Sequence, residues 1–72
     1  MPRWRELKIF CDRDGWELYK DTDHYFYRKI LDNGDILRTK VSKCSGEIHY
    51  HLWQEILCKQ LRTTQEHFNE VI

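Results

Sequence analysis

The apolar positions near the N-terminus follow a helical spacing. They recur at intervals of three and four residues at Trp4, Leu7, Phe10 and Cys11. This interval places apolar side chains on one buried stripe of a helix. We therefore expect a first helix over residues 3–14. It should end before Gly15, because glycine readily adopts the left-handed conformation that follows many helices.

The middle of the chain is rich in residues that favour strands. Residues 16–20 (WELYK) alternate in polarity, residues 24–31 (HYFYRKIL) combine aromatic and branched side chains, and residues 35–41 (DILRTKV) form a third such run. The pair Asn33-Gly34 predicts a two-residue type I′ turn between the second and third strands. Both faces of the strands carry apolar residues, so the sequence leaves open which face is buried.

The C-terminal third returns to helical spacing. Residues 50–62 predict a second helix with a broad apolar face, and Thr63 with Glu66 matches a capping box that would start a short helix through Val71. We expect one α+β domain over residues 1–72, ordered α-β-β-β-α with an extra C-terminal helix. A three-stranded antiparallel sheet with helices on one face is the economical packing of that order, which is the order of double-stranded-RNA-binding domains.

Composition and charge narrow the class of protein. The chain of 72 residues is 40% hydrophobic and 14% aromatic, which favours a folded domain. Its net charge is zero, a mild argument against nucleic-acid binding, but residues 24–43 hold five basic residues against two acidic ones. The three cysteines do not suggest a disulfide framework, and no apolar run approaches the roughly 20 residues of a membrane span. We expect a cytoplasmic protein with reduced thiols and no membrane association.

The candidate chemistry centres on His24, at the start of the aromatic and basic run. A histidine titrates near neutrality and can accept the proton of a ribose 2′-hydroxyl. Arg28 and Lys29 can hold phosphate by charge-assisted hydrogen bonds, and the aromatic side chains of residues 25–27 can stack on unpaired bases. These residue types suit RNA cleavage without a metal. The pattern alone nevertheless favours a solvated histidine without a function, because isolated histidines are common.

Further basic residues follow on or after the third predicted strand. Arg38, Lys40 and Lys43 either extend a phosphate-binding track from Arg28 or form an ordinary solvated face, and the sequence does not decide between these. No metal or cofactor is expected. His49 and His51, two residues apart, do not share a helix face, and the chain has no Cys-x-x-Cys motif.

Four stretches together resemble the HicA family of bacterial and archaeal toxins, small ribonucleases of type II toxin–antitoxin systems. They are RELKIFCDRDGWEL (5–18), DHYFYRK (23–29), NGDILRTKV (33–41) and GEIHYHLWQEILCKQLRTTQEHF (46–68). The second is the most specific, because it is similar to the family's segment in which a Ser-His pair precedes aromatic and basic residues. This chain has Thr22-Asp23 where the family commonly has Gly-Ser, which places a negative charge beside His24.

The resemblance implies a single HicA-like domain with a double-stranded-RNA-binding-like fold. It implies an mRNA interferase that cleaves single-stranded mRNA and so represses translation, with His24 as the catalytic residue and a HicB-type antitoxin that covers the active site. Our candidate RNA contacts are Tyr27, Arg28, Lys29, Arg38, Lys40 and Lys43. The alternative function is a non-catalytic RNA-binding module of the same fold. Formation of a homodimer is left open.

Overall fold

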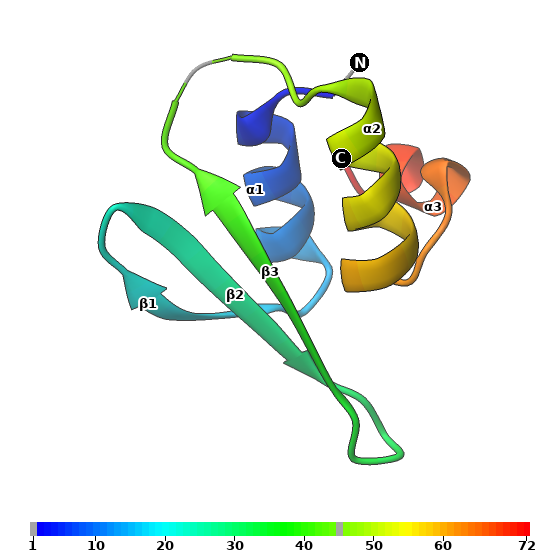
Figure 1. Cartoon of the computed structure of the whole chain (residues 1–72). Coiled ribbons are helices and arrows are strands. Elements are labelled where there is room, and N and C mark those ends of the chain that lie inside the picture. The colour runs from blue at the N-terminus through cyan, green and yellow to red at the C-terminus, as the bar shows by residue number, and fades with distance from the viewer. Residues whose placement is uncertain (1, 45) are drawn as a thin grey trace.

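The computed structural model describes residues 2–44 and 46–72 and has an α+β architecture (Figure 1). The elements are helix α1 (Trp4–Arg13), strands β1 (Glu17–Asp21), β2 (His24–Ile30) and β3 (Ile36–Ser42), helix α2 (Tyr50–Glu55), the π-helical turn η1 (Ile56–Gln60) and helix α3 (Gln65–Val71). The predicted order α-β-β-β-α with an extra C-terminal helix is confirmed. Among the described residues, no helix is long and apolar enough to cross a membrane.

The three strands form an antiparallel sheet in the order β1-β2-β3. β2 and β3 pair without interruption from His24 opposite Ser42 to Ile30 opposite Ile36. The pairing of β1 with β2 is irregular, because the register shifts between Leu18 and Lys20. Tyr19 is therefore left out of the ladder, as the extra residue of a β-bulge is.

The alternation of burial along β3 shows which face of the sheet points inward. Leu37, Thr39 and Val41 are buried, whereas Arg38 and Lys40 between them are exposed. The first set faces the helices and the second lies on the open face, since successive side chains of a strand point to opposite sides. The sequence alone left this choice of face open.

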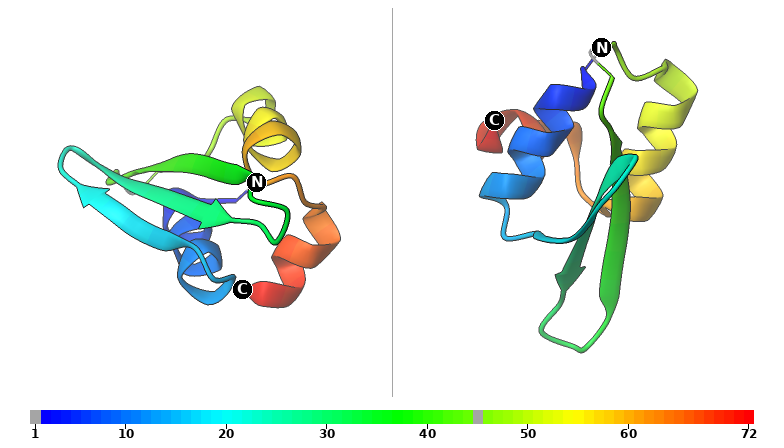
Figure 2. Two further views of the ribbon diagram at one scale, coloured as in Figure 1. Left: turned by 90° about the horizontal axis from the view of Figure 1, so that it is seen from below. Right: turned by 90° about the vertical axis from the view of Figure 1, so that its left-hand side faces the viewer.

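The helices pack against the inner face of the sheet and along its β3 edge (Figures 1 and 2). α1 contacts β3 and α3, while η1 contacts β3. Rings from all three helices meet in the core: those of Phe10 and Phe68 stack with centroids 5.1 Å apart, and Trp53 meets Phe68 edge-on at 4.8 Å. The buried apolar residues are Leu7, Phe10, Cys11, Trp16, Tyr27, Leu37, Val41, Ile48, Trp53, Ile56, Leu57, Leu61 and Phe68.

The turn between β2 and β3 differs from the type I′ turn that the sequence predicts. A type I′ turn needs positive φ at both central residues, but only Gly34, at φ 93°, has it. The Gly34 amide instead donates to the Leu31 carbonyl at 2.9 Å, and the Asp35 amide donates to Asn33 Oδ1 at 3.0 Å. The side chain of Asn33 therefore stabilises a longer loop rather than a two-residue turn.

The last helix begins one residue later than the capping-box prediction. Its N-cap is Thr64, whose Oγ1 accepts a hydrogen bond from the His67 amide at 3.1 Å. The prediction that Thr63 caps this helix with Glu66 is wrong, because the chain leaves η1 through Arg62 in a left-handed conformation at φ 51°. This reversal carries Thr63 ahead of the helix start.

Candidate functional site

His24 opens β2 and lies at the end of the sheet opposite Ser42. The side chain is half-buried, and its Nδ1 atom is buried without a hydrogen-bond partner in residues 2–44 and 46–72. Its ring meets that of Phe26, two residues along the same face of β2, edge-on with centroids 6.3 Å apart. Within the described residues, therefore, no hydrogen bond at Nδ1 determines which of the two ring nitrogens carries the proton.

A cavity of about 320 Å³ opens beside His24, between the end of the sheet and the second helix. Its lining residues come from α1, β2, β3, α2 and η1: Trp4, His24, Lys40, Ser42, Leu52, Ile56 and Gln60. The cavity brings a titratable imidazole, an ammonium group and a hydroxyl to one apolar-walled space. The sequence predicts His24 and Lys40 as site residues, whereas Ser42 and Gln60 are not among the predicted residues.

The position of Gln60 depends on the π-helical turn. The Leu61 amide bonds to the Ile56 carbonyl at 2.8 Å, five residues back, which is the π-helical pattern. The Gln60 side chain then reaches the sheet, where its Oε1 accepts a hydrogen bond from Thr39 Oγ1 at 2.8 Å. This bond satisfies the hydroxyl of Thr39, which is 5% exposed.

The five predicted cations differ in their ion pairs. Arg28 bonds to Glu17 at 3.0 Å, Lys29 to Asp14 at 3.1 Å, and Lys43 to Asp21. The pairs of Arg28 and Lys43 are exposed, and such pairs contribute little to stability, so a phosphate can displace the acid at small cost. Arg38 and Lys40 make no ion pair with any described residue and are the freest cations of the predicted set.

Two of the predicted RNA contacts, Tyr27 and Lys29, lie on the inner face of the sheet, opposite to the face that carries His24. Tyr27 points into the core and is 1% exposed, and its hydroxyl donates to Asp12 Oδ1 at 2.7 Å. Burial and this carboxylate both raise the pKa of the Tyr27 hydroxyl. Lys29 shares that inner face and bonds to Asp14 of the turn after α1. Tyr27 and Lys29 therefore do not share the open face with His24, because alternate residues of β2 point to opposite sides, and RNA contact by either residue stays a prediction.

The open face instead carries two aromatic rings that lie near one another. The centroids of Tyr19 and Phe26 are 6.3 Å apart with the planes inclined at 55°. The Lys20 ammonium lies 5.3 Å from the Phe26 centroid, and the Arg28 guanidinium lies 5.3 Å from that of Tyr19. The aromatic run predicts stacking by Phe26, whereas Tyr19 lies outside the predicted contacts. Leu18 pairs with the inward-facing Tyr27, so the alternation of a strand places Tyr19 on the open face.

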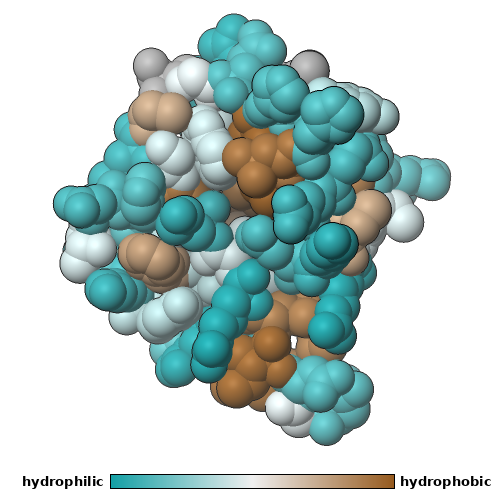
Figure 3. Space-filling view, viewed as in Figure 1, coloured by the Kyte–Doolittle hydropathy of each residue, from teal (hydrophilic) through white to brown (hydrophobic). Residues whose placement is uncertain are grey.

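Hydrophilic side chains dominate the view of the molecule in Figure 3, with strongly hydrophobic patches between them. One such patch lies at the hairpin end of the sheet, where the cross-strand pair Ile30 and Ile36 is 62% and 47% exposed. It holds no titratable group, so it contributes apolar surface rather than chemistry.

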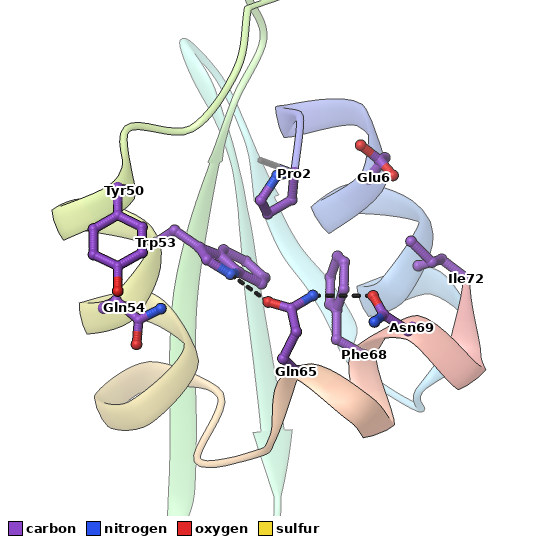
Figure 4. Close-up of a pocket in the computed structure, with 9 residues that line it drawn as sticks. All are labelled: Pro2, Glu6, Tyr50, Trp53, Gln54, Gln65, Phe68, Asn69 and Ile72. Atoms are coloured by element: carbon purple, nitrogen blue, oxygen red, sulfur yellow. Dashed lines mark hydrogen bonds between the residues drawn. The ribbon is translucent and has the colours of Figure 1, made fainter.

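A larger cavity, of about 400 Å³, lies between the three helices and contains none of the predicted site residues (Figure 4). Its polar lining is largely engaged within the protein. Gln65 Oε1 accepts a hydrogen bond from Trp53 Nε1 at 2.7 Å, and the Gln65 amide nitrogen donates to Asn69 at 3.0 Å. The first bond joins α2 to α3 and the second lies within α3, so we assign the lining a structural function.

The remaining histidines and cysteines are scattered. The rings of His49 and His51 are 5.5 Å apart at the start of α2, and the described residues contain no group of three or more histidine, cysteine or acidic side chains that could hold a metal ion. All three cysteines are free thiols. Burial of Cys11 in the core raises the pKa of its thiol.

Comparisons of the chain with protein-family models, with curated proteins and with solved structures gave no match. The HicA resemblance therefore stays a prediction that rests on the four sequence stretches.

Proposed function

We propose that this protein is a metal-independent endoribonuclease that cleaves single-stranded mRNA, as a HicA-type toxin does. The observation that carries the proposal is the His24 cavity. Within residues 2–44 and 46–72, the His24 Nδ1 atom has no hydrogen-bond partner and the Lys40 ammonium on the same cavity has no ion pair. The confirmed α-β-β-β-α order supports it at the level of fold. On this proposal the natural inhibitor is a HicB-type antitoxin that covers the cavity.

The proposed reaction needs one proton acceptor and one source of positive charge. His24 accepts the proton of a ribose 2′-hydroxyl, whose oxygen attacks the adjacent phosphorus. The bond from phosphorus to the 5′-oxygen breaks, and that oxygen takes a proton from solvent. The products carry a 2′,3′-cyclic phosphate and a 5′-hydroxyl. Lys40 stabilises the negative charge that develops on the phosphate oxygens during attack.

The exposed cations extend the phosphate site away from the cavity. Arg38 alternates with Lys40 on the open face of β3, and Arg28 lies directly opposite Arg38 on β2. Lys43 follows the strand at the His24 end of the sheet. We assign these four to the backbone of the RNA, with Lys40 nearest the scissile phosphate.

The test is cleavage of a single-stranded RNA by purified protein without added metal. His24→Ala should reduce the rate about 10²- to 10⁴-fold, which is the usual contribution of a general base. His51→Ala is the matched control, because His51 is exposed on α2 and outside the cavity, and it should cleave like the wild type. Replacing the 2′-hydroxyl at the cleaved position by hydrogen should block the reaction.

Three results separate the hypotheses. Equal rates for wild type and His24→Ala would exclude His24 as the base. Cleavage of the 2′-deoxy substrate would exclude the mechanism. A wild type that binds RNA without cutting it, and does not arrest growth when induced, would favour the non-catalytic RNA-binding module.

A further inference from the structure

We infer that Tyr19 and Phe26 form a platform on the open face of the sheet that stacks unpaired bases of an RNA strand next to the His24 cavity. We call these two rings the aromatic platform. A second hollow of about 300 Å³ is lined by Tyr19, Phe26, Arg38, Thr39, Lys40 and Gln60. Lys40 and Gln60 line both this hollow and the His24 cavity, so the two spaces adjoin.

The register of β1 places the second ring of the platform, that of Tyr19, on the open face. Lys20 is the pairing partner of Phe26, and the register shift leaves Tyr19 outside the ladder. Leu18 pairs with the inward-facing Tyr27, so alternation along β1 places Tyr19 on the open face, where its ring centroid lies 6.3 Å from that of Phe26. Tyr19 remains 41% exposed and Phe26 partly exposed, although burying such rings is favourable. Exposed rings at this spacing suit a ligand with flat faces.

The charges around the platform select a polyanion as that ligand. Lys20 and Arg28 lie over the two rings, and Arg38 and Lys40 line the same hollow. Within the residues that the structure describes, the carboxylate that contacts these cations is Glu17, which bonds to Arg28 at the exposed edge of the sheet. Aromatic faces bordered by cations are the combination that binds single-stranded nucleic acid, whose bases stack while its phosphates meet the cations.

Unpaired RNA fits this surface better than a duplex does. In a duplex the flat faces of the bases are covered by their neighbours, so only the phosphates could reach the sheet. The 55° inclination between the two planes also favours bases that are unstacked from one another. The inference depends on the proposed function only for the substrate's position relative to His24. Binding by the platform does not need catalysis.

The experiment measures RNA affinity by fluorescence anisotropy in the His24→Ala protein, so that cleavage does not interfere. The probe is a labelled single-stranded RNA of about 12 nucleotides, compared with an RNA duplex of equal length. Tyr19→Ala and Phe26→Ala should each weaken single-strand binding roughly 5- to 150-fold, the usual effect of losing one stacked base. Tyr50→Ala is the matched control, because Tyr50 is 52% exposed on α2, away from the sheet, and its affinity should be unchanged.

Two further variants guard against misfolding and separate stacking from charge. Tyr19→Phe keeps the ring and should retain the affinity that Tyr19→Ala loses. Lys40→Ala should lower the slope of log affinity against log salt by about one, whereas Tyr19→Ala should leave that slope unchanged.

The outcomes for the platform and for the proposed function are distinguishable. Parent-like affinity in Tyr19→Ala and Phe26→Ala overturns the platform even if the wild type cleaves RNA. Loss of affinity in both, with a wild type that does not cleave, supports the platform and refutes the nuclease. Equal loss for the duplex and the single strand overturns base stacking. No RNA affinity, together with self-association that Tyr19→Ala abolishes, means that a second copy of the chain covers the face instead.

Discussion

At the scale of single residues, the face of a strand decides what a side chain can do. Tyr25, Phe26 and Tyr27 are consecutive aromatic residues with similar chemistry. Only Phe26 lies on the open face with His24, because Tyr25 packs against the core and Tyr27 is buried within it. An aromatic run therefore indicates stacking surface in general, but it does not say which ring a base can reach.

The buried position of Tyr27 predicts what its hydroxyl oxygen contributes to stability. Tyr27→Phe should lower the free energy of unfolding by about 1 kcal/mol, because it removes the hydrogen bond to the Asp12 carboxylate while the ring stays packed. Urea unfolding followed by tryptophan fluorescence measures this change. RNA affinity should equal that of the wild type. A loss of RNA affinity at unchanged stability would return Tyr27 to the RNA-contacting set.

At the scale of elements, local irregularities position the site. The bulge in β1 makes Lys20 the partner of Phe26 and places its ammonium 5.3 Å from the Phe26 centroid. The π-helical turn η1 brings Gln60 to Thr39 at the wall shared by the two cavities. π-helical turns and bulges are costly compared with regular structure and often occur at functional sites. Both irregularities in this chain lie beside the open face that carries His24.

The start of α3 provides a prediction with a matched pair of threonines. Thr64→Ala should lower the free energy of unfolding by about 1 kcal/mol, because the Thr64 hydroxyl satisfies the otherwise unpaired His67 amide. Thr63→Ala should change it by much less, since the Thr63 side chain makes no hydrogen bond within the described residues. Thermal or urea unfolding of both variants measures the difference. A larger loss for Thr63→Ala would support the capping box that the sequence alone predicts.

At the scale of the whole molecule, Asp14 connects elements that are far apart in sequence. Its carboxylate follows α1 and accepts hydrogen bonds from Lys29 of β2 at 3.1 Å and Trp16 at 3.2 Å, and it meets His67 of α3 at 3.1 Å. Partial burial alone would raise the pKa of Asp14, but these partners together lower it below the usual 3.8. A small domain with a thin core depends on such connections.

The lowered pKa of Asp14 predicts how stability changes with pH. A carboxylate with a lower pKa in the folded state stabilises the fold above its unfolded pKa of 3.8, and this contribution is lost as the pH falls through the folded value. Asp14→Asn should therefore cost about 1 to 2 kcal/mol at pH 7, and the difference from wild type should shrink towards pH 2. Urea unfolding at several pH values measures it.

Asp32→Asn is the control for this prediction, because the Asp32 side chain makes no hydrogen bond or ion pair within the described residues. A cost for Asp14→Asn that is the same at pH 7 and pH 2 would show that the carboxylate charge does not contribute.

Several parts of the fold and site could be predicted because they depend on neighbouring residues. Helix spacing around Leu7 and Phe10, strand-forming runs and the glycine after α1 act within a few positions. For α3 the sequence predicts a cap one residue too early, at Thr63 instead of Thr64. At Asn33 it predicts a turn of two residues, and the observed loop is longer. Each depends on how the preceding segment ends, which several local patterns fit equally well.

The sequence by itself determined the order of the elements, the α+β class and the segment that carries His24 with its basic and aromatic neighbours. Hydrophobic spacing and composition can be read within each segment, and they do not depend on how the elements pack together. Tertiary structure alone decided that Tyr27 and Lys29 face inward, that Tyr19 joins Phe26, and that Lys40 shares a cavity with His24. These facts follow from strand register and from the packing of a helix beside β3, and both depend on contacts between residues far apart in the chain.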